Sequence, residues 1–335
     1  MQTYKPQRFS AEQYAEAILK EDRIMLARAI TLIESSLEKD QLIAEKLIEY
    51  LLPHTGNSLR IGITGVPGVG KSSFIESFGE YIIEQTQSKL AVLAIDPTSQ
   101  KSRGSILGDK TRMEKLSQNP QCFIRPSPAG NSLGGIAKKT RESLLLCEAA
   151  GFNLIFIETV GVGQSEVLVS EMTDFFLLLM LAGAGDELQG IKKGIMEMAD
   201  LLVITKADGE NKLKSLEAKQ NYQNALHLFR ANEMDWHPPV TTCSALYKEG
   251  LENILFLIKQ YIKSSKEKGF FEKKRQKQQI DWFRQTLKES LVDYFFRNEG
   301  FQKTIIEAEQ SILEQKKDAF GAVREILGKY LQTKD

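Results

Sequence analysis

The 335-residue sequence is poor in the residues that most often bind metals or form disulfides, with three cysteines and three histidines. The three cysteines, Cys122, Cys147 and Cys243, lie far apart and do not have the spacing of metal ligands. Their number is odd, whereas a set of disulfides needs an even number. The histidines lie near no other ligand types, which disfavours a histidine metal site or a catalytic triad. We therefore expect the cysteines to be small buried hydrophobic residues, and the chemistry to depend on other side chains.

Net charge and long apolar runs are also lacking. Lys and Arg total 44, as do Asp and Glu, so no bulk electrostatic argument favours a nucleic acid or an anionic membrane as a partner. The most apolar run, residues 175–184, has about half the length of a membrane-spanning helix and is typical of a buried strand. Residues 1–21 mix charges throughout, unlike a signal peptide. The sequence predicts a cytoplasmic protein.

Hydrophobic periodicity divides the chain into three parts. Residues 1–56 are predicted to form an N-terminal helical extension, with Ser10 as a helix cap and a break at 53–57. In residues 57–264, short apolar runs alternate with amphipathic helices, the pattern of a doubly wound, mostly parallel α/β sheet. The expected strands are 60–64, 90–95, 122–124, 154–158, 175–181, 201–205 and 239–243.

The last part, residues 265–335, has no strand pattern and is predicted to be helical, with its final helix from about 302 to 330. A stripe of apolar residues repeats there at helical spacing and needs a partner surface. That surface is either the main domain or a second copy of the chain. The stripe consists of Trp282, Leu287, Leu291, Tyr294 and Phe295.

The strongest motif lies at residues 65–72, between a predicted strand and a predicted helix, where a P-loop nucleotide-binding protein has its phosphate-binding loop. Backbone N–H groups and the helix N-terminus bind phosphate oxygens in such a loop. Lys71 is expected to reach the β- and γ-phosphates, and the Ser72 hydroxyl to ligate Mg²⁺. The predicted phosphate-binding residues are Gly65, Val66, Pro67, Gly68, Val69, Gly70, Lys71, Ser72 and Ser73.

Two further predicted strands end in a carboxylate on the same sheet edge. Glu158 ends an apolar strand and is followed by Gly161, as in a Walker B strand and second switch, so we expect Glu158 to hold Mg²⁺ and Gly161 to sense the γ-phosphate. Asp96 is a candidate to orient the attacking water or bind the metal, and Asp109 is a candidate metal ligand. The alternative for both aspartates is a helix cap or a turn.

A base-recognition motif is expected at the end of strand 201–205. Thr205, Lys206 and Asp208 resemble the guanine-reading NKxD motif, in which the aspartate accepts hydrogen bonds that adenine cannot donate. Thr205 replaces the usual asparagine, a change expected to cost about 1 kcal/mol and to weaken affinity more than specificity. The segment Ser244, Ala245 and Leu246 resembles the loop that binds guanine O6.

The motifs in this order resemble those of the methylmalonyl-CoA mutase-associated GTPases of the MeaB/ArgK type, within the SIMIBI class of P-loop GTPases. The segments that carry this resemblance are 94–99, 104–113, 158–166 and 184–192. The resemblance implies GTP/GDP and Mg²⁺ as cofactors, a C-terminal homodimerisation arm, and a chaperone that gates adenosylcobalamin delivery to an acyl-CoA mutase. It also implies an additional switch loop that couples to the partner, with Asp186, Glu187, Gln189 and Lys192.

Intrinsic hydrolysis is expected to be slow and to be stimulated by a partner. Val162 stands where Ras-type switches place their water-orienting glutamine, although Gln164 is near; Arg103 and Arg112 are candidate arginine fingers in cis.

One alternative function is a P-loop ATPase or kinase associated with arginine/ornithine transport. Another is a metallochaperone GTPase for nickel enzymes, which the lack of His/Cys clusters disfavours.

Overall fold

The structure is a computed structural model that describes residues 8–95, 113–127, 133–159, 165–183, 193–229 and 233–331. It divides into two compact units, Met1–Gln278 and Gln279–Asp335. No helix within these described ranges is long and apolar enough to cross a membrane.

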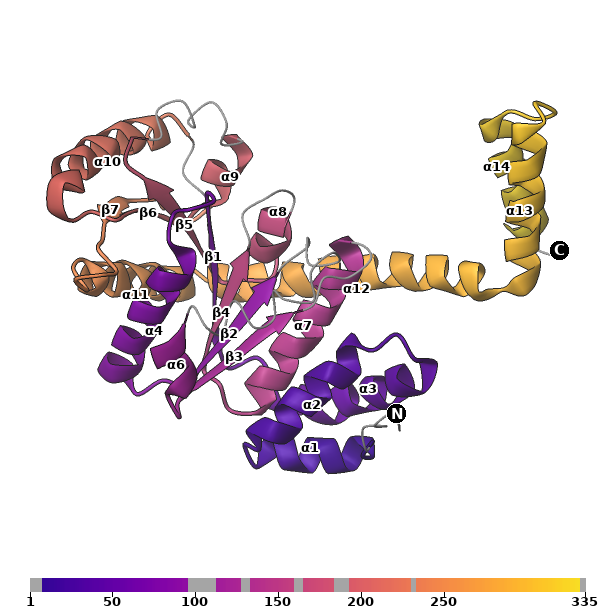
Figure 1. The fold of residues 1–335 in the computed structure, drawn as a ribbon, viewed down its shortest axis with the longest axis horizontal. Helices are drawn as coiled ribbons and strands as arrows, with labels where there is room; N and C mark the ends of the chain where they lie inside the picture. The colour runs from indigo at the N-terminus through magenta and orange to yellow at the C-terminus, as the bar shows by residue number, and fades with distance from the viewer. Residues whose placement is uncertain are drawn as a thin grey trace, which may run out of the picture. The chain divides into compact units, whose positions relative to one another are not determined.

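A seven-stranded parallel sheet forms the centre of the first unit, with the strand order β3-β2-β4-β1-β5-β6-β7 (Figure 1). The doubly wound sheet expected from the sequence is therefore confirmed, and three strands have the predicted bounds. The strand order reverses at β1, which places the end of β1 at the switch point where such sheets bind nucleotides. The strands are β1 (Leu59–Gly65), β2 (Leu90–Ile95), β3 (Cys122–Ser127), β4 (Leu154–Thr159), β5 (Phe175–Leu181), β6 (Leu201–Thr205) and β7 (Val240–Thr242).

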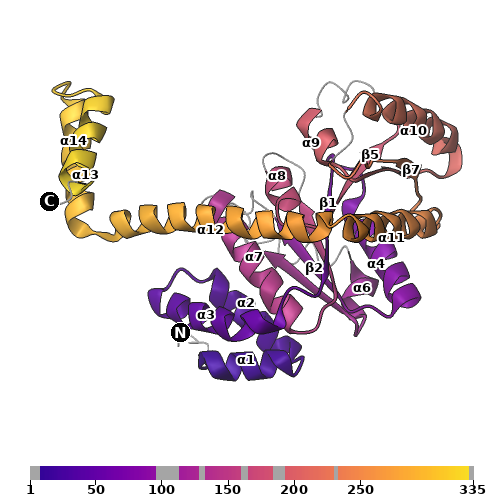
Figure 2. The same cartoon turned by 180° about the vertical axis from the view of Figure 1, so that it is seen from behind.

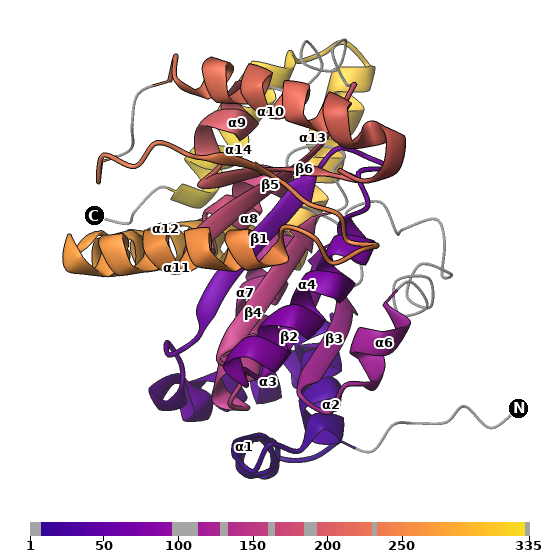
Figure 3. The ribbon, with the colours of Figure 1, turned by 90° about the vertical axis from the view of Figure 1, so that its left-hand side faces the viewer.

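Helices cover both faces of the sheet (Figure 3). One face forms the main core with α4 (Lys71–Thr86), α6 (Glu114–Gln118) and α11 (Leu251–Glu267), where Phe74, Phe78 and Phe156 stack. The other face packs on α9 (Lys193–Met198) and α10 (Lys212–Leu226). The remaining elements of this region are α7 (Leu133–Ala149), α8 (Ser165–Ser170) and the 3₁₀ turn η3 (Gly209–Asn211).

Three N-terminal helices pack against α7 (Figure 2), followed by the 3₁₀ turn η1 (Leu52–His54). They are α1 (Ala11–Leu19), α2 (Arg23–Glu34) and α3 (Glu38–Leu51). Ser10 caps α1 in a capping box with Gln13, as the sequence predicts. The half-buried Glu34 pairs with Arg125 of β3, so a charge pair as well as apolar contacts joins the N-terminal helices to the sheet.

The C-terminal helices are α12 (Phe270–Arg297), α13 (Glu299–Leu313) and α14 (Ala319–Leu331). The expectation of one helix from about 302 to 330 is wrong, because the chain turns after α13. Gln315 takes a left-handed conformation with φ of 56°, and the side chain of Asp318 accepts a hydrogen bond from the N–H of Gly321. Gln315 therefore ends α13, and Asp318 caps the N-terminus of α14. In the second unit, Phe301 and Tyr330 join α13 to α14 by an edge-to-face contact with ring centroids 5.0 Å apart.

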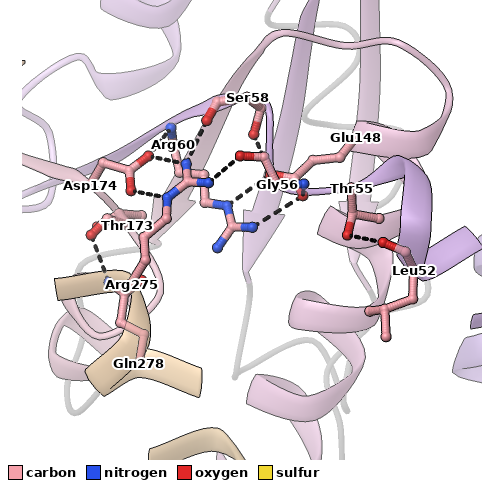
Figure 4. A network of polar contacts seen from close by, with 10 residues as sticks. All are labelled: Leu52, Thr55, Gly56, Ser58, Arg60, Glu148, Thr173, Asp174, Arg275 and Gln278. Atoms are coloured by element: carbon pink, nitrogen blue, oxygen red, sulfur yellow. Dashed lines mark hydrogen bonds and ion pairs between the residues drawn. The ribbon is translucent and has the colours of Figure 1, made fainter. Parts of the chain in front are cut away.

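A polar network lies at the amino edge of the sheet, opposite the edge where parallel strands end (Figure 4). The guanidinium of Arg275, in α12, donates to both oxygens of Asp174 at 2.8 and 2.7 Å. It also donates to the carbonyl oxygens of Gly56 and Ser58, each at 2.5 Å. One guanidinium therefore joins α12 to the entry of β1 and to the start of β5.

The same network extends to α7 through a second buried ion pair. Arg60 donates to both oxygens of Glu148 at 2.9 and 3.1 Å, while its backbone N–H donates to Asp174. Glu148 also accepts from the Ser58 hydroxyl and from the N–H of Gly56. Burial raises the pKa of Glu148, but the charge of Arg60 and the hydrogen bonds from Arg60, Ser58 and Gly56 together outweigh burial, and the net pKa is lowered. We call these six residues, 56, 58, 60, 148, 174 and 275, the amino-edge network.

Asp174→Ala tests this network. The side chain of Asp174 is buried, and its removal leaves the Arg275 guanidinium without its carboxylate and the Arg60 N–H without an acceptor. We expect the free energy of unfolding to fall by about 3–5 kcal/mol, measured by chemical denaturation. Glu16→Ala, which breaks an exposed pair with Lys20, is the control and should leave the denaturation midpoint unchanged. Equal effects of the two variants would contradict this account.

Candidate functional site

The loop between β1 and α4 has the backbone that a phosphate-binding loop needs. Gly68 and Gly70 have φ values of 78° and 87°, in the left-handed region that side chains disfavour. A Cβ on Gly65 would lie 2.5 Å from the carbonyl oxygen of Leu179, so only glycine lets β1 end this close to β5. The loop then leads directly into α4, whose first residue is Lys71 and whose second, Ser72, is half-buried.

The ammonium of Lys71 lies across this loop. It donates to the carbonyl oxygens of Gly65 at 2.8 Å and Val66 at 3.4 Å. Burial lowers the pKa of Lys71, while the carboxylates of Glu158 and Glu166 oppose that shift. The loop therefore carries a half-buried cation with two carboxylates near enough to act on it.

Glu158 occupies the predicted place at the carboxyl edge of the sheet. It lies in β4 opposite Ile63 of β1 and Ala94 of β2, and it is 7% exposed. The hydroxyls of Thr64 and Thr159 are 2.7 Å apart and join the ends of β1 and β4. The Ser72 hydroxyl and the Glu158 carboxylate are oxygen donors of the kind that Mg²⁺ prefers, so these residues fit that ion.

Thr205 joins the predicted base motif to the phosphate loop. Its buried hydroxyl lies 2.7 Å from the carbonyl oxygen of Val69 and 3.2 Å from that of Met180. The next residue, Lys206, takes φ of 54° and donates to the carbonyl oxygen of Gly68 at 2.8 Å. Two successive side chains at the end of β6 therefore donate hydrogen bonds to carbonyl oxygens of the phosphate loop.

Asp208 contacts the loop after β7, so the structure brings the two predicted base-binding segments together. The Ser244 hydroxyl donates to Oδ2 of Asp208 at 2.5 Å and accepts from the N–H of Tyr247 at 3.2 Å. The carbonyl oxygen of Ala245 accepts from the Ser77 hydroxyl of α4 at 2.8 Å, a contact that no sequence motif indicated. Leu246, the last predicted residue of this loop, is exposed. The loop thereby orients Asp208 and contacts the helix that begins at the phosphate loop.

Several predicted residues lie outside the described ranges. They are Asp96, Asp109, Gly161, Asp186, Glu187, Gln189 and Lys192, together with Arg103, Arg112, Val162 and Gln164. Within the described ranges, no group of three His, Cys, Asp or Glu side chains could hold a metal ion. The structure also adds a residue that was not selected from the sequence, the buried Glu166 of α8.

The first unit has a doubly wound parallel sheet with a phosphate-binding loop at its switch point. The loop after β7, residues 244–246, orients Asp208, and we call it the base loop. Together these features define a P-loop GTPase. The family described as "Methylmalonyl Co-A mutase-associated GTPase MeaB" matches residues 26–300. The chain belongs to this family, as the motifs indicated, and it is a GTPase that binds guanine nucleotide.

Similar proteins cover most of the chain. GTPase ArgK of Escherichia coli is 45% identical over 84% of this chain and 85% of its own. A protein of Mus musculus named methylmalonic aciduria type A homolog, mitochondrial, is 40% identical over 92% of this chain and 76% of its own. A crystal structure titled LAO/AO transport system kinase superposes with a TM-score of 0.75 at 34% identity, over 98% of this chain and 100% of that one.

Thr205→Val tests the role of the threonine. Valine keeps the shape but leaves the Val69 carbonyl oxygen without this donor, so GDP affinity should fall by about 1–2 kcal/mol, or roughly 5- to 30-fold. Thr205→Ser retains the hydroxyl and should bind GDP nearly as the wild type does. Calorimetric titration with GDP measures both. Wild-type affinity in the valine variant would show that the hydroxyl does not support the loop.

Proposed function

We propose that this GTPase is a chaperone that gates adenosylcobalamin loading and protection of an acyl-CoA mutase of the methylmalonyl-CoA mutase type. The observation that carries the proposal is the family match over residues 26–300, which contains both the phosphate loop and the base loop. The similarity to the methylmalonic aciduria type A homolog supports the same partner. We place the protein in the cytoplasm, with no nucleic-acid or membrane partner.

Lys71 and Asp208 are the described side chains that would bind the two parts of the nucleotide, the phosphates and the base. Lys71, which donates to carbonyl oxygens of its own loop, would donate instead to the β- and γ-phosphates, since these carry the larger negative charge. Asp208, oriented by Ser244, would accept from the guanine N1–H and 2-amino groups. Adenine cannot donate that pair of hydrogen bonds, and the carboxylate would then stay unpaired against it. This arrangement selects guanine nucleotides.

Mg²⁺, when bound, would neutralise charge on the transferred phosphoryl group. Ser72 and Glu158 would hold it, together with Asp96 and Asp109. Asp96 would also orient the attacking water, and the N–H of Gly161 would contact the γ-phosphate. Since Val162 provides no side-chain amide for that water, intrinsic turnover is slow and a partner accelerates it.

Domain roles follow the same family assignment. Residues 1–56 form an N-terminal extension, residues 57–264 the GTPase domain and residues 265–335 an arm that joins two copies of the chain. In the second unit three residues of the apolar stripe are exposed, Leu287 at 47%, Leu291 at 51% and Tyr294 at 72%, while Trp282 and Phe295 are half-buried. A second copy that covers this stripe would remove it from water.

The names ArgK and transport system kinase, borne by similar proteins, favour the alternative of an ATPase or kinase in arginine/ornithine transport. The contact between Asp208 and Ser244 argues against it, because a carboxylate oriented in this way suits guanine rather than adenine. The chaperone function is therefore the better supported of the two.

Partner stimulation tests the proposed function. GTP hydrolysis should rise well above the intrinsic rate when an adenosylcobalamin-dependent acyl-CoA mutase from the same organism is added. A triple variant, Asp186→Ala with Glu187→Ala and Lys192→Ala, should lose most of this stimulation but retain intrinsic turnover and nucleotide affinity, because coupling needs different partner affinities for the GTP and GDP states. Lys71→Ala is the inactive control. A mutase that neither binds nor stimulates the wild type would overturn the chaperone assignment.

Charge placed in the stripe tests the homodimer. Leu287→Glu with Leu291→Glu should convert a dimeric full-length chain into a monomer, because burying two carboxylates without partners is strongly unfavourable. Leu213→Glu with Leu216→Glu makes the same change on the exposed face of α10 and should stay dimeric. Light scattering coupled to size-exclusion chromatography measures the mass. A monomeric wild type would rule out this role for the arm.

A further inference from the structure

We propose that Glu166 belongs to the divalent-cation site beside the phosphate loop, where its carboxylate accepts hydrogen bonds from the water shell of the ion. This inference rests on the Mg²⁺ site of the proposed function. It gives a role to Glu166, which ends the segment 158–166 but is not among the site residues expected from the sequence.

The first observation is the state of the Glu166 side chain. The residue is 4% exposed, and its Oε2 is buried without a hydrogen-bond partner. A buried carboxylate oxygen without a partner is unfavourable and is retained in few places in a protein. Oε2 of Glu166 can therefore accept a hydrogen bond from a ligand or from an ordered water.

The second observation is where α8 places this carboxylate. The helix packs closely on the face of β1 opposite α4, since a Cβ on Gly62 would lie 2.7 Å from Cγ1 of Val169 and 3.1 Å from Oγ1 of Thr173. Its chain direction, from the end of β4 to the start of β5, puts Glu166 in the first turn, at the carboxyl edge of the sheet. The charge of Glu166 acts on Lys71, as does that of Glu158.

These positions favour a cation site over a simple ion pair. Lys71 donates to the carbonyl oxygens of Gly65 and Val66, while Oε2 of Glu166 has no hydrogen-bond partner among the described residues. Two buried carboxylates, those of Glu158 and Glu166, therefore act on the ammonium of Lys71 without a direct hydrogen bond to it from Glu166. Mg²⁺ keeps several waters and is held by one or two carboxylates, and those waters need acceptors. Glu158 is the direct ligand in this arrangement, and Oε2 of Glu166 is an acceptor for a bound water.

Glu166→Gln is the test, with Mn²⁺ as the probe in place of Mg²⁺. Electron paramagnetic resonance gives the affinity of Mn²⁺ for the GDP complex, and calorimetry in a chelator gives the affinity for GDP alone. Acceptors that orient the ligands of a metal are typically worth about 10- to 100-fold in metal affinity. We expect Glu166→Gln to weaken Mn²⁺ binding by roughly tenfold and to leave metal-free GDP affinity unchanged.

Matched variants separate the possible outcomes. Glu171→Gln removes the same charge just beyond α8, at an exposed position, and should bind Mn²⁺ as the wild type does. Glu166→Asp keeps the charge on a shorter side chain and should give an intermediate affinity; it also serves if the glutamine variant does not fold. Glu158→Gln should lose most of the Mn²⁺ affinity.

Two results would overturn the inference while the proposed cation site stands. In the first, Glu158→Gln loses Mn²⁺ affinity but Glu166→Gln retains it. In the second, Glu166→Gln weakens GDP binding equally with and without metal, which would mean that Glu166 acts on the phosphate loop itself. A wild-type GDP complex that binds no Mn²⁺ would instead contradict the proposed Mg²⁺ site.

Discussion

The close approach of β1 to β5 at Gly65 is the constraint on which the nucleotide site depends. Since any side chain there would collide with the Leu179 carbonyl oxygen, the end of β1 lies against its neighbour, and the phosphate loop starts from a defined place. Thr205 and Lys206 then hold the loop from the end of β6 through the carbonyl oxygens of Val69 and Gly68. The phosphate site and the base site are therefore parts of one hydrogen-bonded edge.

The opposite edge of the same sheet is held by charge rather than by close backbone packing. The amino-edge network places two guanidinium–carboxylate pairs where β1 and β5 begin, and it includes the first turns of α12. Buried pairs of this kind demand a single geometry because every partner is needed to offset desolvation. Strand β5 starts next to Asp174 at this edge and reaches the phosphate loop at Leu179. One short strand therefore contributes to the amino edge and to the carboxyl edge of the sheet.

Charge balance at the phosphate loop connects the structure to the chemistry. Lys71 is half-buried, and burial disfavours its ammonium, yet Glu158 and Glu166 offset part of this effect. A GTPase needs these groups near one another, because the lysine binds the phosphates and the carboxylates bind the metal ion. Glu166 lies in α8 and Lys71 in α4, so helices on both faces of the sheet contribute charge at the phosphate loop. The site therefore extends beyond the strand ends that carry the phosphate-binding and Walker B motifs.

Local sequence determined most of the fold and the core of the site. Short apolar runs located all seven strands. Gly68 and Gly70 predicted the phosphate loop because their left-handed conformations are decided within a few residues, whereas the need for glycine at 65 comes from Leu179. Three features needed the tertiary structure. The chain turn at Gln315 depends on a left-handed backbone at a residue other than glycine. The contact of Thr205 with the phosphate loop depends on which carbonyl oxygens lie beside it. The burial of Glu166 depends on how α8 packs on β1, and a local pattern specifies neither feature.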